Sequence, residues 1–182
     1  SASTTTPTVS WLGSQAFTNT ATVYTVSGAT LGAAASNRSI VIAVGGARSS
    51  SGDRNVNSVT VGGSSATQVI GRHGNSNSQE FWFIDLASGT SGDIVATFNS
   101  SMVPASITWW RVLDLGQPIS TDTVQQDGYT TLDITTIGQT GDVVFYALQD
   151  SGSSGGYTWS NATERAEHLN ITSGPTDGSA GT

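Results

Sequence analysis

Short runs of Val, Ile, Thr and aromatic residues recur along the whole chain, separated by Gly, Ser and Asn. Such runs are typical of β-strands, because β-branched and aromatic side chains fit a pleated surface and glycine-rich segments supply turns. We expect about ten strands from this pattern. The expected segments are Val9-Trp11 extending toward Phe17, Thr22-Val26, Ser39-Val44, Ser58-Val61, Ala66-Ile70, Gln79-Leu86, Asp93-Phe98, Ser106-Leu113, Thr130-Thr135 and Asp142-Leu148. A last pair is expected near Tyr157-Ser160 and Thr163-Leu169.

Two local patterns refine this expectation. The stretch VTVGGSSATQV centres two alternating runs on Gly62-Gly63, and glycine tolerates the positive φ of a tight turn, so a hairpin is predicted there. Only Gly28-Ser36 has a briefly helical pattern.

The chain length of 182 residues fits one domain with its own core. The sequence therefore predicts an all-β fold, a single antiparallel β-sandwich over residues 1–172 with an N-terminal arm at 1–20. The last segment, SGPTDGSAGT at 173–182, has no apolar periodicity and is predicted to be a flexible tail or linker.

Two strands carry large apolar side chains on both of their faces. In SITWWRVLDL the adjacent Trp109 and Trp110 must leave on opposite sides of an extended strand. In EFWFIDL, Trp82 alternates with Phe81 and Phe83 in the same way. A sheet that is apolar on both faces needs a cover on its second face, because a bare aromatic patch usually marks a contact site.

Three covers are consistent with the sequence. The first is intramolecular, by the N-terminal arm through Trp11 and Phe17 or by the long loops. The second is a neighbouring subunit, since aromatic residues are enriched at protein interfaces. The third is a ligand, most simply a sugar ring stacked on a tryptophan. The candidate interface or glycan contacts are Phe81, Phe83, Trp110, Tyr157 and Trp159.

Charge and composition exclude several partners. The chain has no Lys and no Cys, and its net charge of -7 has the wrong sign for phosphate backbones or anionic lipid. No apolar run approaches the roughly 20 residues of a membrane span, so neither nucleic acid nor membrane insertion is expected. No signal peptide is visible at the start of the sequence.

Candidate catalytic motifs fail on their context. The segment GSSGG places Ser154 in a G-x-S-x-G pattern, but an expected strand follows it in place of the helix that this motif requires. His73 and His168 have no spaced partners that would form a metal or catalytic site, and both are expected to be solvated loop or edge histidines. Asp53 opens a D-x-N-x-N run that lacks the glycine and glutamate of a calcium loop. No catalytic residue, metal site or cofactor is therefore expected.

The strings SVTVGGSSATQV, QEFWFIDLASGTSGDIVATF and ASITWWRVLDL resemble a group of small β-rich structural proteins of tailed bacteriophages and phage-like particles. The similarity covers residues 20–170. It implies a virion-associated, jelly-roll-like β-sandwich that acts as an oligomer, with a trimer as the expected state, and it implies no catalytic residues.

The first functional hypothesis is therefore a non-enzymatic virion structural protein, a head decoration, spike or tail/fibre component that assembles through its aromatic sheet faces. Its partners would be other copies of itself or other virion proteins, and its location the virion. The alternative is an extracellular glycan-binding β-sandwich for host-surface adhesion. A hydrolase is a third reading, without recognisable catalytic geometry.

Overall fold

The computed structural model describes residues 6–48, 50, 52–73, 76–116, 143 and 145, and the backbone of three further strands at 146–150, 164–168 and 177–181. Every element among these residues is a β-strand. None of the described residues belongs to a helix with the length and apolar character needed to cross a membrane. The predicted all-β fold is confirmed.

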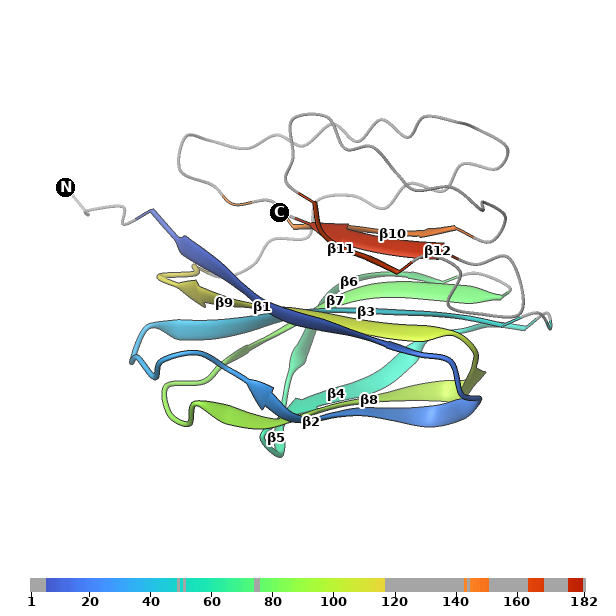
Figure 1. Cartoon of the computed structure of the whole chain (residues 1–182), viewed down its shortest axis with the longest axis horizontal. Coiled ribbons are helices and arrows are strands. Elements are labelled where there is room, and N and C mark those ends of the chain that lie inside the picture. Colours follow the sequence, from blue (N-terminus) through green and yellow to red (C-terminus); the bar gives the residue numbers. More distant parts are fainter. Residues whose placement is uncertain are drawn as a thin grey trace.

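Two antiparallel sheets face each other as a sandwich (Figure 1). The five-stranded sheet has the order β1-β9-β3-β7-β6, and the four-stranded sheet has the order β2-β8-β4-β5. The bounds in the first sheet are β1 Thr8–Phe17, β9 Ala105–Leu113, β3 Arg38–Ala47, β7 Asn77–Asp85 and β6 Thr67–His73. Those in the second sheet are β2 Ala21–Thr30, β8 Ser91–Met102, β4 Val56–Val61 and β5 Ser64–Ser65.

The pairing is nested, as in a long hairpin that has been rolled up. β1 pairs with β9, β2 with β8, β3 with β7 and β4 with β5, all antiparallel. From β1 to β4 and from β7 to β9 each strand lies in the other sheet from the one before it; β5 stays in the sheet of β4, and the chain then returns to the five-stranded sheet, where β6 pairs with β7. This is the connectivity of a jelly roll.

The main core lies between the two sheets, where alternating residues of each strand point inward. It includes Ile40, Ile42 and Val44 of β3, Trp82 of β7, Ile94 and Phe98 of β8, and Trp109 of β9. The Tyr24 hydroxyl donates to the Met102 carbonyl oxygen at 2.5 Å and so ties β2 to the end of β8. Burial raises the pKa of Tyr24 further above neutral pH, where the hydroxyl is protonated and can donate.

The predicted hairpin is confirmed, and it is shorter than its sequence pattern. Gly62 and Gly63 have φ of 57° and 83°, the left-handed conformations of a two-residue turn. The returning strand β5 has only two residues, after which the chain moves to the other sheet.

The glycine at position 13 of β1 is required by a close approach of a side chain. A Cβ at Gly13 would lie 2.7 Å from the Trp109 ring, so the ring would have to shift.

The helical prediction for Gly28-Ser36 is wrong. Residues 28–30 continue β2, and residues 31–37 form a loop and turn. Pairing of Ala29 and Thr30 with Gly92 and Ser91 of β8 satisfies the backbone there and overrides the local preference.

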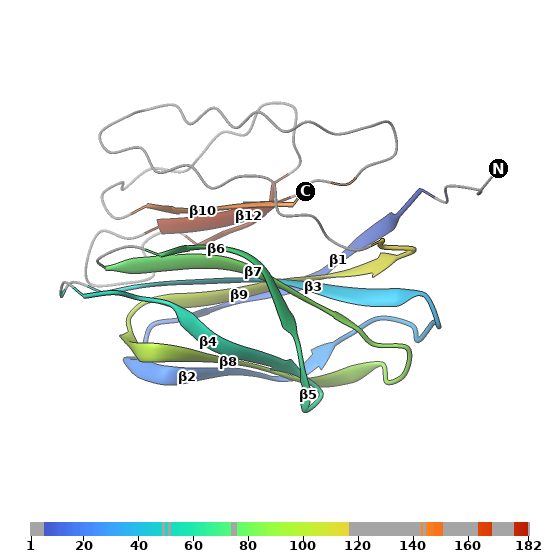
Figure 2. The ribbon, with the colours of Figure 1, turned by 180° about the vertical axis from the view of Figure 1, so that it is seen from behind.

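A third sheet of order β10-β12-β11 lies over the outer face of the five-stranded sheet (Figures 1 and 2). Its strands are β10 Tyr146–Asp150, β11 Glu164–His168 and β12 Asp177–Gly181. β12 lies within the segment predicted as a tail; DGSAG has no apolar pattern to recognise, and its backbone pairs with β10 and β11. β1 lies within the segment predicted as the N-terminal arm, and its backbone pairs with β9. The strands predicted at Thr130-Thr135 and Tyr157-Ser160 lie outside the described residues.

Candidate functional site

The outer face of the five-stranded sheet carries a second apolar cluster, which we call the outer cluster. Its buried members are Val41, Ala43, Trp110 and Val112, and the partly buried Val9, Phe81, Phe83, Leu115 and Phe145 pack against them. Three of the five predicted contact residues, Phe81, Phe83 and Trp110, are therefore brought together. Tyr157 and Trp159 lie outside the described residues.

The adjacent tryptophans do leave on opposite faces of the sheet. Trp109 enters the main core between the sheets, whereas Trp110 enters the outer cluster. Strand β3, which lies between β9 and β7, is buried along its whole length, in agreement with cover on both faces.

The cover over Trp110 comes from the chain itself. Trp110 is 0% exposed, and its ring lies 5.4 Å from that of Phe145 in an edge-on arrangement. Phe81 lies 6.5 Å from both of these rings. Of the three expected covers, the structure has the intramolecular one: Phe145 packs on Trp110, and Val9 of the N-terminal strand also packs against the outer cluster. Trp110 is thus not accessible to a sugar ring or to another chain.

The two indoles differ in hydrogen bonding. Trp109 Nε1 donates to the Thr30 carbonyl oxygen at 2.9 Å. Trp110 Nε1 is buried and finds no hydrogen-bond partner among the residues that the structure describes. Burial of an unpaired donor costs about 1–3 kcal/mol.

This difference predicts unequal effects of the same substitution at adjacent positions. Trp109→Phe should destabilise the protein by about 1–3 kcal/mol more than Trp110→Phe, because only the first breaks a hydrogen bond and the second removes an unpaired donor. Both changes delete the same ring atoms, so each is the control for the other. Urea unfolding measures the difference, and equal losses or the reverse order would contradict the assignment of the two indoles.

A buried carboxylate that sequence reasoning missed lies at one end of the main core. Glu80 of β7 is 0% exposed and accepts from β4, β6 and β7. Its Oε1 lies 2.6 Å from Val56 N, 2.8 Å from Ser78 Oγ and 3.3 Å from His73 Nδ1; its Oε2 lies 2.8 Å from Gln68 Nε2 and 3.2 Å from Trp82 Nε1. One signal was available in the sequence: Glu80 alternates with Trp82 on the inner face, where a charge needs partners.

The same network includes His73, which is the last residue of the edge strand β6 and has a partly exposed side chain. Its Nδ1 also lies 3.2 Å from the Arg54 carbonyl oxygen. His73, Glu80 and Ser78 do not form a nucleophilic triad, because the buried Ser78 hydroxyl donates to the carboxylate and makes no bond to the imidazole. His168 belongs to β11, whose side chains are not described, and Ser154 lies outside the described residues.

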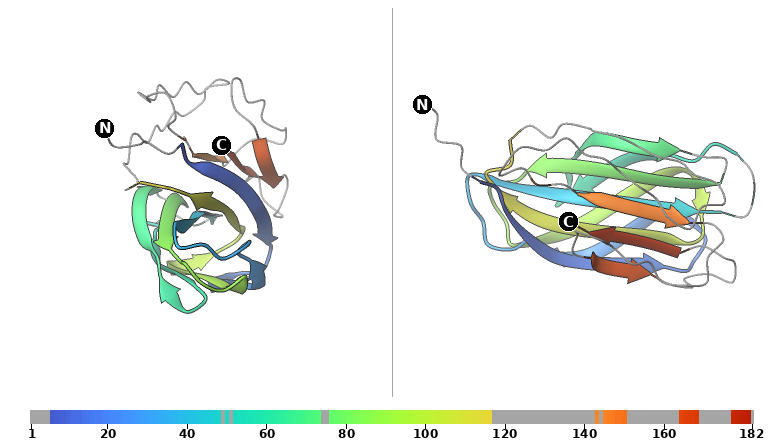
Figure 3. Two further views of the ribbon diagram at one scale, coloured as in Figure 1. Left: turned by 90° about the vertical axis from the view of Figure 1, so that its left-hand side faces the viewer. Right: turned by 90° about the horizontal axis from the view of Figure 1, so that it is seen from above.

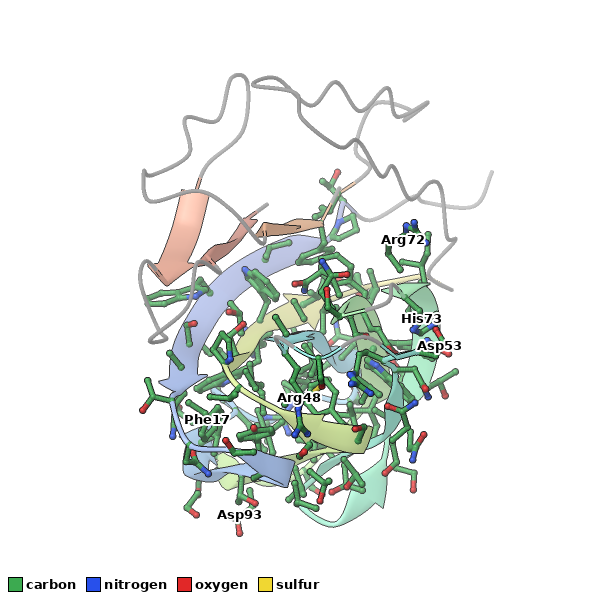
Figure 4. The ribbon with its side chains drawn as sticks, turned by 90° about the vertical axis from the view of Figure 1, so that its right-hand side faces the viewer. Phe17, Arg48, Asp53, Arg72, His73 and Asp93 are labelled. Atoms are coloured by element: carbon green, nitrogen blue, oxygen red, sulfur yellow. The ribbon has the colours of Figure 1, made fainter. Side chains whose placement is uncertain are left out.

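Charged side chains gather at the end of the sandwich seen in Figure 4, where Arg48, Asp53, Arg72 and His73 are labelled. They are largely engaged with the protein itself: Arg48 donates to the Ser101 carbonyl oxygen at 3.0 Å, and Arg72 to that of His73 at 2.8 Å. In the segment that follows Asp53, Asn55 Nδ2 donates to Asn57 Oδ1 at 3.0 Å. Within the described residues, no three His, Cys, Asp or Glu side chains are grouped as a metal site would require.

At the opposite end of β3, Arg38 is buried, and its guanidinium donates to backbone carbonyl oxygens of two separate loops. Burial lowers the pKa of Arg38, and the nearby positive charge of Arg111 lowers it further. Both buried charges, Arg38 and Glu80, therefore hold elements of the sandwich together.

Comparisons with known proteins do not assign the chain to a family. No protein-family model matches it, and neither the curated proteins nor the solved structures contain a match.

Proposed function

We propose that this chain is a non-enzymatic structural protein of a phage or phage-like particle, a head decoration, spike or tail/fibre component. One observation carries the proposal: the five-stranded sheet is apolar on both of its faces. The four-stranded sheet covers one face, and the third sheet, β10-β12-β11, lies over the other. A central sheet packed on both faces suits a component whose task is mechanical.

The polar interior supports the same proposal. The carboxylate of Glu80 accepts bonds from its own strand and from β4 and β6, and the guanidinium of Arg38 donates to loop carbonyls. Groups whose hydrogen-bonding capacity is used in this way stabilise one arrangement and are not free to act on a substrate.

Mass spectrometry of gradient-purified particles from the producing culture tests the role. We expect peptides of this chain to sediment with the major shell proteins and to remain after a high-salt wash, because apolar contacts are not screened by salt. A soluble host enzyme serves as the marker for contamination. Recovery of the chain only with that soluble marker would reject the virion location and the structural role together.

The alternative is a glycan-binding module in an extracellular setting. The observation in its favour is Trp11, which is 45% exposed on β1 and so offers an aromatic face to solvent. The earlier candidates Tyr157 and Trp159 stay predictions, since they lie outside the described residues.

A further inference from the structure

We draw no further inference here: the strongest candidate, the surface patch at the exposed Trp11 on strand β1, which runs along one side of the sandwich (Figure 3), carries none because nothing in the structure shows what covers it.

Discussion

Arg38→Met should lower the free energy of unfolding by about 3–5 kcal/mol, one of the two largest losses that we expect from a single substitution. Arg38 is 1% exposed and begins β3, the central strand of the five-stranded sheet. Its guanidinium contacts four carbonyl oxygens: Leu86 at 2.6 Å, Leu31 at 3.2 Å, Gly32 at 3.0 Å and Ser88 at 2.7 Å.

The expected loss of stability comes from the carbonyl oxygens that lose the Arg38 donors. Methionine nearly matches the length of the side chain and avoids the desolvation of a charge, which offsets part of the effect. It leaves carbonyl oxygens of the β2–β3 and β7–β8 loops without these donors, however, and an unpaired buried acceptor such as that of Leu31 costs about 1–3 kcal/mol. Both loops are released at once because one planar group holds them.

Urea unfolding followed by tryptophan fluorescence measures this loss. Arg72→Met is the matched control, since Arg72 is only partly buried on the edge strand β6, and surface changes of this kind stay within about 0.5–1 kcal/mol. Arg38→Lys should fall between the two, because an ammonium keeps the charge but cannot span the same carbonyls. A loss below about 1 kcal/mol for Arg38→Met would mean that the loops are held by other contacts.

Glu80→Gln should cost about 2–4 kcal/mol although it changes neither the size nor the shape of the side chain. Each carboxylate oxygen of Glu80 has at least two donors within 3.3 Å. In the glutamine variant, one of the two carboxylate oxygens is replaced by an NH2 group. In either orientation this NH2 group faces hydrogen-bond donors, where an acceptor is needed. No rotation of the amide avoids this conflict.

Asp85→Asn on the same strand is the control for Glu80→Gln. Asp85 is exposed and accepts from Ser39 Oγ at 2.5 Å, so its loss should stay below about 1 kcal/mol. Denaturant unfolding of both variants gives the comparison. Equal losses would show that the Glu80 network does not depend on its charge.

The candidate site could be predicted only in part, and the residues show why. The two-faced character of Trp109-Trp110 and of Phe81 and Phe83 follows from strand geometry alone, and the structure places all three of Phe81, Phe83 and Trp110 in one cluster. Their cover could not be predicted, because Phe145 follows Trp110 by a long stretch of chain and no local pattern relates the two. Glu80 was missed for a similar reason: its donors include Val56 and Gln68, which lie 24 and 12 residues away.

What the sequence by itself determined is local. Alternating side chains identify strands and their two faces, and Gly62-Gly63 specifies a turn, because the pleat and the positive φ are properties of a few consecutive residues. Only the tertiary structure decided the nested strand order, the extension of β2 through Gly28–Thr30 and the partners of Arg38 and Glu80. Those depend on backbone and side-chain groups that are distant in sequence and meet only when the two sheets close on each other.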